Sequence, residues 1–152
     1  MSNIWEKIRL IRQSWRDPKK LNVLLDEWER SFGDVYNQMA EELVAEHTRT
    51  AWAKLSSQKE VTSLDALISI LWEEWTEGEF TIERTETEVQ IYCTKCPIAD
   101  AYKSINKEKY GILFHCNEDP FIVEGFNPEI KFRRTKTLMN SDDCCDHLYS
   151  LK

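Results

Sequence analysis

Hydrophobic residues recur every three or four positions through the first third of the chain, which is the spacing of an amphipathic helix. This pattern predicts a helix over residues 4–15 and a second helix over residues 21–55. Asp17-Pro18 separates the two, because proline fixes its own backbone dihedral and restrains the residue before it. Gly33 interrupts the second stripe and indicates a kink or a short break.

A third helix is predicted between Thr62 and Gly78. Thr62 and Asp65 have the spacing of a capping box, and glycine is a common residue just after a helix end. Hydrophobic residues at helical spacing supply its buried face: Leu64, Leu67, Ile68, Leu71, Trp72 and Trp75. The three predicted helices would make residues 1–77 a helical scaffold.

The period of the pattern then changes to two, which indicates half-buried strands. Residues 80–83 and 89–93 alternate apolar and polar side chains and predict a hairpin. Residues 130–138 and 144–151 predict a second hairpin. Its turn, residues 140–143, consists of Asn, Ser and Asp, whose side chains cap their own backbone.

The segment between the hairpins is less regular. Pro97 suits the first turn of a helix that continues to Ile105, and a short element is expected over residues 110–116. Residues 119–128, with two prolines and a glycine, predict a loop. Helices followed by strands favour an α+β fold, in which the helical N-terminal half packs on an antiparallel sheet built from the two C-terminal hairpins.

The composition is that of a folded, acidic protein. A chain of 152 residues, 41% of them hydrophobic, is long enough for one domain with a core. We expect a single domain over residues 1–152, with residues 78–152 as the α+β part that carries all five cysteines. The net charge of -7 disfavours nucleic acid and anionic membranes as partners, because both need a basic face.

The chain also predicts a cytoplasmic location. Charged residues interrupt the start, Met1–Lys7, before any apolar signal-peptide core forms. The longest apolar stretch, Ala66–Trp72, is too short to span a bilayer. We therefore expect reduced thiols, and an odd number of cysteines cannot pair fully within one chain.

The densest chemistry lies in the run Asp142-Asp143-Cys144-Cys145-Asp146-His147. Strand alternation places Cys145 and His147 on one face and Cys144 and Asp146 on the other. Cys145 and His147 could form a thiolate–imidazolium pair with a nucleophilic sulfur, or they could give two ligands to zinc.

The other cysteines have plainer explanations. Cys93 lies on the apolar face of its strand, where a thiol most often fills core space. The spacing of Cys93 and Cys96 is a weak metal or redox signal on its own. A site that joins Cys96, Cys116 and Cys145 from three different elements is easier to build, and it could hold zinc, iron or no metal.

Four ordered stretches of the second half resemble the L-2-amino-thiazoline-4-carboxylic acid hydrolase family. They are Cys96-Pro97-Ile98-Ala99-Asp100-Ala101-Tyr102, Gly111-Ile112-Leu113-Phe114-His115-Cys116 with Asp119, Gly125-Phe126-Asn127-Pro128, and Ser141-Asp142-Asp143-Cys144-Cys145-Asp146. The resemblance selects Cys96, Cys116 and Cys145, and it leaves Cys93 and Cys144 at positions where the family varies. The chain departs from the family pattern at Ser141, where the family has glycine, and a turn that needs a positive φ tolerates serine poorly.

The resemblance implies hydrolytic opening of a cyclic isothiourea, by attack at the amidine carbon and expulsion of sulfur or nitrogen. Cys145 or Cys96 would act as the nucleophile or as a metal ligand, with Cys116 in the same cluster. The groups that would handle the proton are Asp143, Asp146 and His147. The candidates for binding the substrate and its carboxylate are Arg133, Arg134, Lys136 and Asn127.

A second class of function stays open at this point. The three cysteines could belong to a non-enzymatic module that holds a metal or a small ligand, and an inactive family member is a third possibility. The partner in either main case is a small molecule. An enzyme for a carboxylated substrate should aim basic residues at the cysteines, whereas a metal site should bring three sulfurs within reach of one ion.

Overall fold

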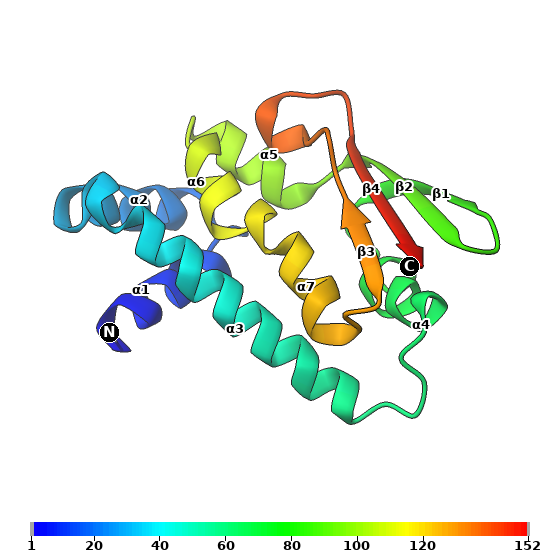
Figure 1. Ribbon diagram of the computed structural model, residues 1–152. Helices are drawn as coiled ribbons and strands as arrows, with labels where there is room; N and C mark the ends of the chain where they lie inside the picture. Colours follow the sequence, from blue (N-terminus) through cyan, green and yellow to red (C-terminus); the bar gives the residue numbers. More distant parts are fainter. Residues whose placement is uncertain (1, 152) are drawn as a thin grey trace.

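The computed structural model describes residues 2–151, so Met1 and Lys152 lie outside the described part of the expected domain. The helices are α1 (Ser2–Gln13), α2 (Pro18–Ser31), α3 (Asn37–Ser57), α4 (Leu64–Ile68), α5 (Pro97–Ser104), α6 (Glu108–Phe114) and α7 (Asp119–Phe126). The strands are β1 (Glu79–Arg84), β2 (Glu88–Lys95), β3 (Ile130–Arg133) and β4 (Cys145–Leu151). The predicted α+β class, with N-terminal helices and an antiparallel sheet from C-terminal hairpins, is confirmed (Figure 1).

The N-terminal helices begin and end close to the predicted breaks. Asp17 caps α2 by accepting a hydrogen bond from the Lys20 backbone N–H at 3.2 Å, and Pro18 occupies the first turn. The predicted helix over residues 21–55 is in fact two helices. Gly33 has φ +59, which no regular right-handed helix accommodates, and a short 3-10 turn (η1, Gly33–Tyr36) joins α2 to α3.

The third helix is shorter than predicted and has a different cap. The Ser63 hydroxyl, rather than that of Thr62, accepts the N-terminal hydrogen bond, from the Ala66 N–H at 3.2 Å. After α4 the backbone widens into one π-helical turn (η2, Ser69–Glu73), and the helix ends well before Gly78. A π-turn changes which side chains face inward, and here it places Trp72 against the sheet.

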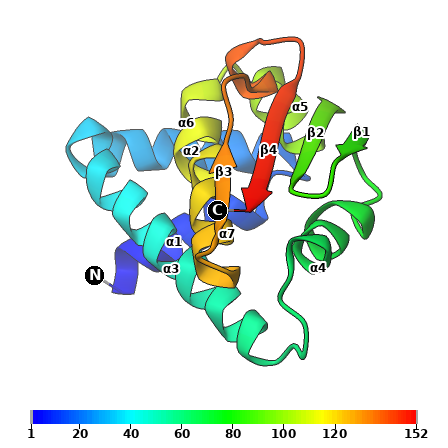
Figure 2. The same cartoon turned by 45° about the vertical axis from the view of Figure 1, so that its right-hand side comes forward.

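The sheet has the strand order β1-β2-β4-β3, with every neighbouring pair antiparallel. Both hairpins are confirmed, and the chain joins them by pairing β2 with β4 in the middle. Helices α4 and α7 bury one face of this sheet, and Figure 2 shows α7 behind β3.

The first strand of the second hairpin is shorter than predicted. β3 ends at Arg133, so the expected strand over residues 134–138 is wrong. The Asp146 carboxylate holds this segment out of the sheet, because it accepts hydrogen bonds from the backbone N–H groups of Thr135 at 2.8 Å and Lys136 at 2.6 Å.

The connection then closes through a short 3-10 turn (η4, Leu138–Asn140). Asp142 accepts a hydrogen bond from the Thr137 backbone N–H at 2.9 Å and fixes the base of this turn. Ser141 follows with φ +66, the left-handed conformation that a glycine would adopt without steric cost. The departure from the family pattern therefore falls on a position where the backbone does require a positive φ.

The loop predicted over residues 119–128 is mostly the helix α7. Pro120 sits in its first turn, where a missing N–H costs nothing, so it starts the helix instead of breaking it. Gly125 lets α7 approach α3 closely, because a Cβ there would collide with the backbone carbonyl of Arg49. The two helices run side by side in Figure 1.

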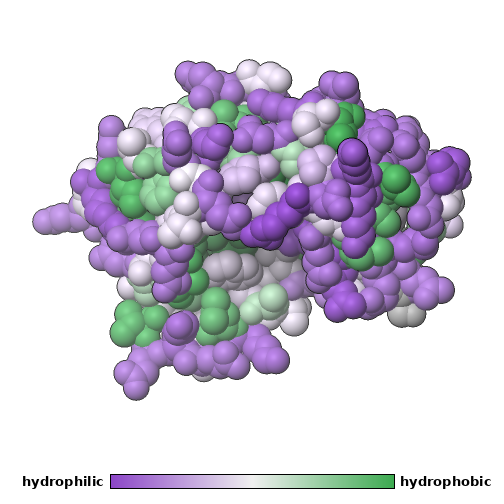
Figure 3. Space-filling view, turned by 180° about the vertical axis from the view of Figure 1, so that it is seen from behind, coloured by the Kyte–Doolittle hydropathy of each residue, from purple (hydrophilic) through white to green (hydrophobic). Residues whose placement is uncertain are grey.

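The buried side chains form two clusters that meet at one seam. One cluster joins α1, α2, α3, α5 and α6, and the other joins α4, α7 and the sheet. Cys96 and Leu138 pack against both clusters. The surface opposite the view of Figure 1 is mainly hydrophilic, with hydrophobic groups in separate patches (Figure 3). Within residues 2–151 no helix is long and apolar enough to cross a membrane.

Candidate active site

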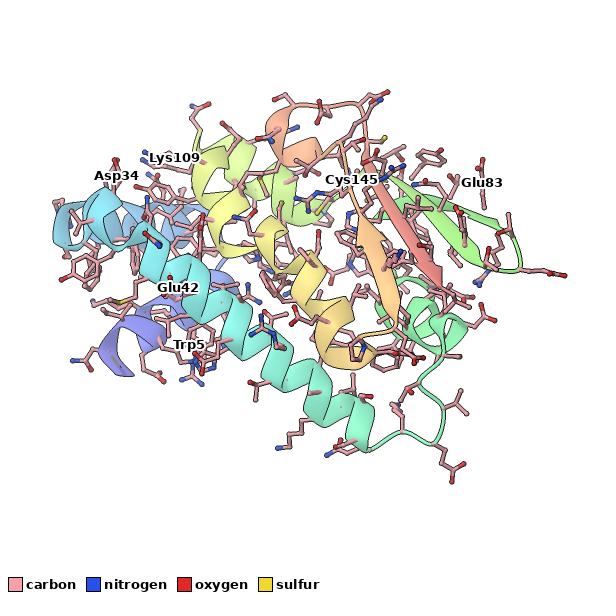
Figure 4. The ribbon with its side chains drawn as sticks, in the orientation of Figure 1. Trp5, Asp34, Glu42, Glu83, Lys109 and Cys145 are labelled. Carbon is pink, nitrogen blue, oxygen red and sulfur yellow. The ribbon has the colours of Figure 1, made fainter. Side chains whose placement is uncertain are left out.

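A cavity of about 210 Å³ lies at the seam between the two clusters. Four of the five cysteines line it: Cys93, Cys96, Cys116 and Cys145. The other polar groups in its wall are Thr137, Tyr149, Glu118, Asp119, His115 and His147, and the remaining lining residues are apolar or aromatic. Figure 4 shows Cys145 at the start of β4, between the helical half and the β1–β2 hairpin.

The pairing of β2 with β4 sets the floor of this cavity. Cys93 lies directly opposite Cys145, and Ile91 lies opposite His147. Side chains that oppose each other across an antiparallel pair share one face of the sheet. Cys145 and His147 therefore face the cavity together, as strand alternation predicts.

The Cys145 sulfur is surrounded by hydrogen-bond donors. The backbone N–H of Leu138 donates to it at 3.2 Å, and the Thr137 hydroxyl lies 3.6 Å away. The Cys93 thiol is the largest influence that lowers the pKa of Cys145, and His147 adds to it, while burial opposes both. The site thus favours the thiolate form of Cys145, which is the nucleophilic form.

The three other thiols of the cavity favour the protonated form. Burial raises the pKa of Cys116 to about 12 and also raises that of Cys96. The hydrogen bond to Cys145, followed by burial, raises the pKa of Cys93. Of this pair, Cys93 therefore keeps its proton, and the Leu138 N–H and the Thr137 hydroxyl beside Cys145 favour the negative charge on Cys145.

The Asp119 carboxyl group and the His147 imidazole line the same cavity as Cys145. The His147 Nε2 lies 3.7 Å from the Asp119 carboxylate, and the Arg134 guanidinium donates to the same carboxylate at 2.6 Å. Burial raises the pKa of Asp119 to about 6, against the lowering effect of His147 and Arg134. With a pKa of about 6, the Asp119 carboxyl group titrates close to neutral pH.

A hydrogen-bond chain fixes the tautomer of His147. The Trp72 indole N–H donates to the Tyr149 hydroxyl oxygen at 2.9 Å. The Tyr149 hydroxyl is 3.2 Å from the His147 Nδ1 and has its own proton to donate there. Since Nδ1 then acts as the acceptor, a neutral His147 carries its proton on Nε2, toward Asp119.

His115 also lines the cavity but is held differently. Its Nε2 is 2.9 Å from the Tyr102 hydroxyl, and the side chain is buried. Burial, followed by the nearby Arg12, lowers the pKa of His115 to about 3. His115 therefore stays neutral at any ordinary pH and acts as part of the wall.

The structure brings together some of the predicted catalytic residues and leaves others outside. Cys96, Cys116, Cys145 and His147 all line the cavity. Asp143 is exposed and pairs with Lys136 at 3.1 Å, so it lies on the surface. Asp146 faces away from the cavity and holds the segment after β3 by accepting hydrogen bonds from its backbone.

None of the predicted substrate-binding residues lines the cavity. The Arg134 guanidinium is occupied by Asp119 and by the Cys116 carbonyl oxygen at 2.9 Å. Arg133 and Lys136 are exposed. Asn127 donates to the Thr62 carbonyl at 2.9 Å and accepts from a backbone N–H, which makes it a local support of the chain after α7.

The three selected sulfurs do not form a metal centre in this geometry. Residues 2–151 contain no group of three His, Cys, Asp or Glu side chains placed to hold one ion. The Thr137 hydroxyl contacts two of the sulfurs, at 3.8 Å from that of Cys116 and 3.6 Å from that of Cys145. The ligand positions therefore give no support to the zinc or iron alternative.

Sequence reasoning left three groups out of the site: Asp119, Thr137 and Cys93. Asp119 had a signal, because it belongs to the same resembling stretch as Cys116 and follows it by one helical turn. Thr137 had none, since a strand was expected there. Cys93 was assigned to core packing, and only the register of β2 with β4 shows that it faces Cys145.

Comparison with known proteins agrees with the motifs. The family model for L-2-amino-thiazoline-4-carboxylic acid hydrolase matches residues 21–149. The chain belongs to this hydrolase family. No curated protein sequence matches the chain. Among solved structures, the fold is similar to that of a trafficking protein particle complex subunit 3 from Naegleria fowleri, covalently bound to palmitic acid. The TM-score is 0.51 at 15% sequence identity, over 92% of this chain and 95% of that one.

The thiols of the cavity should differ sharply in reactivity. At pH 7 iodoacetamide should modify Cys145 at least about tenfold faster than Cys116, because one pKa unit changes the thiolate fraction about tenfold. Peptide mass mapping over a time course measures both rates. In guanidinium chloride, as the control, all five cysteines should react at similar rates. Faster labelling of Cys96 or Cys116 in the folded protein would contradict this assignment.

Proposed function

We propose that this protein is a thiol-dependent hydrolase that opens the ring of a small cyclic amidine or isothiourea, with Cys145 as the nucleophile. The observation that carries the proposal is the environment of Cys145. Its sulfur accepts the Leu138 N–H, faces a cavity and stands near the acid–imidazole pair of Asp119 and His147. A polarised thiolate beside a proton carrier is the arrangement that covalent hydrolysis needs.

The first step would be attack of the Cys145 thiolate on the amidine carbon of the ring. A C–S bond forms, the ring C–S bond breaks, and the electron pair leaves on the ring sulfur. The substrate then remains attached to Cys145 as an S-linked isothiourea. The nucleophile and the leaving group are both thiolates, and one C–S bond replaces another, so the free-energy change of this step is small.

The second step would release the product by hydrolysis. Water attacks the same carbon and the Cys145 thiolate leaves. One proton of the water passes through His147 and Asp119 to the ring sulfur, and the other goes to the imine nitrogen. The product is a carbamoyl compound with a free thiol, one water heavier than the substrate. Tyr149 and Trp72 support this step, because their hydrogen bonds keep the Nε2 of His147 toward Asp119.

The cavity favours the amidine part of the substrate over its carboxylate. Its volume of about 210 Å³ is below the range of about 300–1,000 Å³ typical for drug-sized ligands, so the occupant is small. No lysine or arginine is among its lining residues, whereas Glu118 and Asp119 are. An amidinium group meets these two carboxylates, which also pair with Arg12 at 2.7 Å and Arg134 at 2.6 Å, and a substrate carboxylate meets no lining lysine or arginine.

Two observations favour a second candidate function, in which Cys145 holds a ligand instead of turning it over. The cavity wall is largely apolar, and the similarly folded subunit from Naegleria fowleri is covalently bound to palmitic acid. A thioester on Cys145 would give this chain a ligand-holding role in a protein assembly. The small volume of the cavity argues against a long acyl chain.

Turnover of 2-amino-thiazoline-4-carboxylic acid and of the same ring without the carboxylate tests the proposal. The ring without the carboxylate should have a kcat/KM at least equal to that of the acid, because the cavity offers no cation. C145S should abolish both activities, while C144S, whose side chain lies outside the cavity, should keep them.

Two results would count against the hydrolase. One is unchanged turnover in C145S. The other is purified protein without turnover of either ring that carries an acyl adduct on Cys145, removable by neutral hydroxylamine. That second result would establish the ligand-holding role.

The pH dependence of turnover should report Asp119. An acid with a pKa of about 6 is ionised above that pH and protonated below it, so kcat/KM should fall by about tenfold for each pH unit below about 6. D119N keeps an oxygen for Arg134 but cannot ionise, and it should lose activity together with this acid limb. A wild-type profile that is flat from pH 5 to pH 8 would contradict the role of Asp119, whatever the variant does.

A further inference from the structure

In the proposed hydrolysis Cys93 only stabilises the Cys145 thiolate and neither forms nor breaks a bond, although it faces the nucleophile directly. Cys93 and Cys145 are opposed residues in the register of β2 with β4. Cys93 is 2% exposed, and its thiol donates to the Lys95 carbonyl at 3.3 Å. A second thiol at this position could form a bond with the Cys145 sulfur.

The backbone geometry allows a bond between the two sulfurs. Opposed residues of an antiparallel pair have Cα atoms about 4.5–5.5 Å apart, which lies within the range of about 4.4–6.8 Å found for disulfides. Both side chains project from the same face of the sheet. A disulfide between Cys93 and Cys145 therefore needs side-chain rotation and no change of fold.

The surroundings favour Cys145 as the thiol that reacts first. Its sulfur accepts the Leu138 N–H at 3.2 Å, and its side chain is only partly buried at the wall of the cavity. Cys93 is almost fully buried behind it. A partly exposed, stabilised thiolate with a second thiol opposite it is the arrangement of a reversible oxidation site.

We propose that Cys145 is a site of reversible oxidation by hydroperoxides and that Cys93 is the thiol that resolves the oxidised sulfur. The Cys145 thiolate attacks the outer oxygen of the peroxide, so the O–O bond breaks, an alcohol or water leaves, and Cys145 becomes a sulfenic acid. Cys93 then attacks the Cys145 sulfur, the S–O bond breaks, and water leaves. Sulfur is oxidised by two electrons in all, and the peroxide is reduced by the same two.

The disulfide removes the thiolate from the cavity and protects it. Without a partner, a sulfenic acid is oxidised further to the irreversible sulfinic acid. With Cys93 opposite, the oxidised form is a disulfide that a small dithiol reductant returns to two thiols by exchange. The hydrolase activity would therefore be switched off by peroxide and restored by reductant.

The other two thiols of the cavity are less well placed to resolve Cys145. The Thr137 hydroxyl contacts both the Cys116 and the Cys145 sulfurs, at 3.8 Å and 3.6 Å, and Cys116 comes from the turn before α7 instead of from a strand paired with β4. Cys96 follows the end of β2 and packs into the seam between the clusters. Neither has the direct cross-strand register with Cys145 that Cys93 has.

Treatment with one to ten equivalents of hydrogen peroxide, followed by alkylation and peptide mass mapping, tests the proposal. The wild-type protein should lose two hydrogen atoms and yield a cross-linked peptide pair containing Cys93 and Cys145, which dithiothreitol reverses. C93S should form no such cross-link. Its Cys145 should instead react with dimedone and then accumulate as sulfinic acid. C144S, the matched control outside the cavity, should behave as wild type.

The outcomes separate this proposal from the hydrolase. A cross-link from Cys145 to Cys96 or Cys116, or persistence of the two-hydrogen loss in C93S, would overturn the role of Cys93. Absence of any oxidation at Cys145 would overturn the proposal entirely. All these readouts are masses, so they stand whether or not the protein opens an amidine ring. Conversely, failure of turnover with a normal Cys93–Cys145 cross-link would overturn only the hydrolase.

Discussion

The antiparallel pairing of β2 with β4 is the interaction on which the rest of the site depends. It joins two hairpins that the chain builds separately, and it sets Cys93 opposite Cys145 and Ile91 opposite His147. A slip by one residue would turn Cys145 and His147 away from the cavity and expose Asp146 to it. The packing of α4 and α7 opposes such a slip, because these helices bury Val89, Ile91 and Tyr149 on the inner face of the sheet.

The segment between β3 and β4 supplies a backbone donor to the Cys145 sulfur. In a regular strand the N–H groups of this segment would form hydrogen bonds with the neighbouring strand. Asp146 and Asp142 instead hold the segment out of the sheet, and this frees the Leu138 N–H to donate to the Cys145 sulfur. Asp142 and Asp146 are therefore structural supports of the nucleophile, and the aspartate that lines the cavity, Asp119, comes from α7.

The sequence predicts the parts of this molecule that depend on local pattern. Helical stripes, period-two strands and the inward direction of Cys145 and His147 all follow from side-chain spacing. The prediction of a loop over residues 119–128 was wrong because proline and glycine occur both in loops and at such positions in helices. Only the packing of this segment on α3 shows that it is a helix. The partners of the site could not be predicted for the same reason, since they depend on strand register and on one irregular turn.

Attack of Cys145 on the substrate can be trapped in acid-quenched samples taken during turnover of 2-amino-thiazoline-4-carboxylic acid and analysed by intact mass and peptide mapping. A transient adduct of the mass of the substrate is expected on the peptide that contains Cys145, and it should be absent from C145S. Steady turnover with an unmodified Cys145, or an adduct located on Cys96, would contradict attack by Cys145.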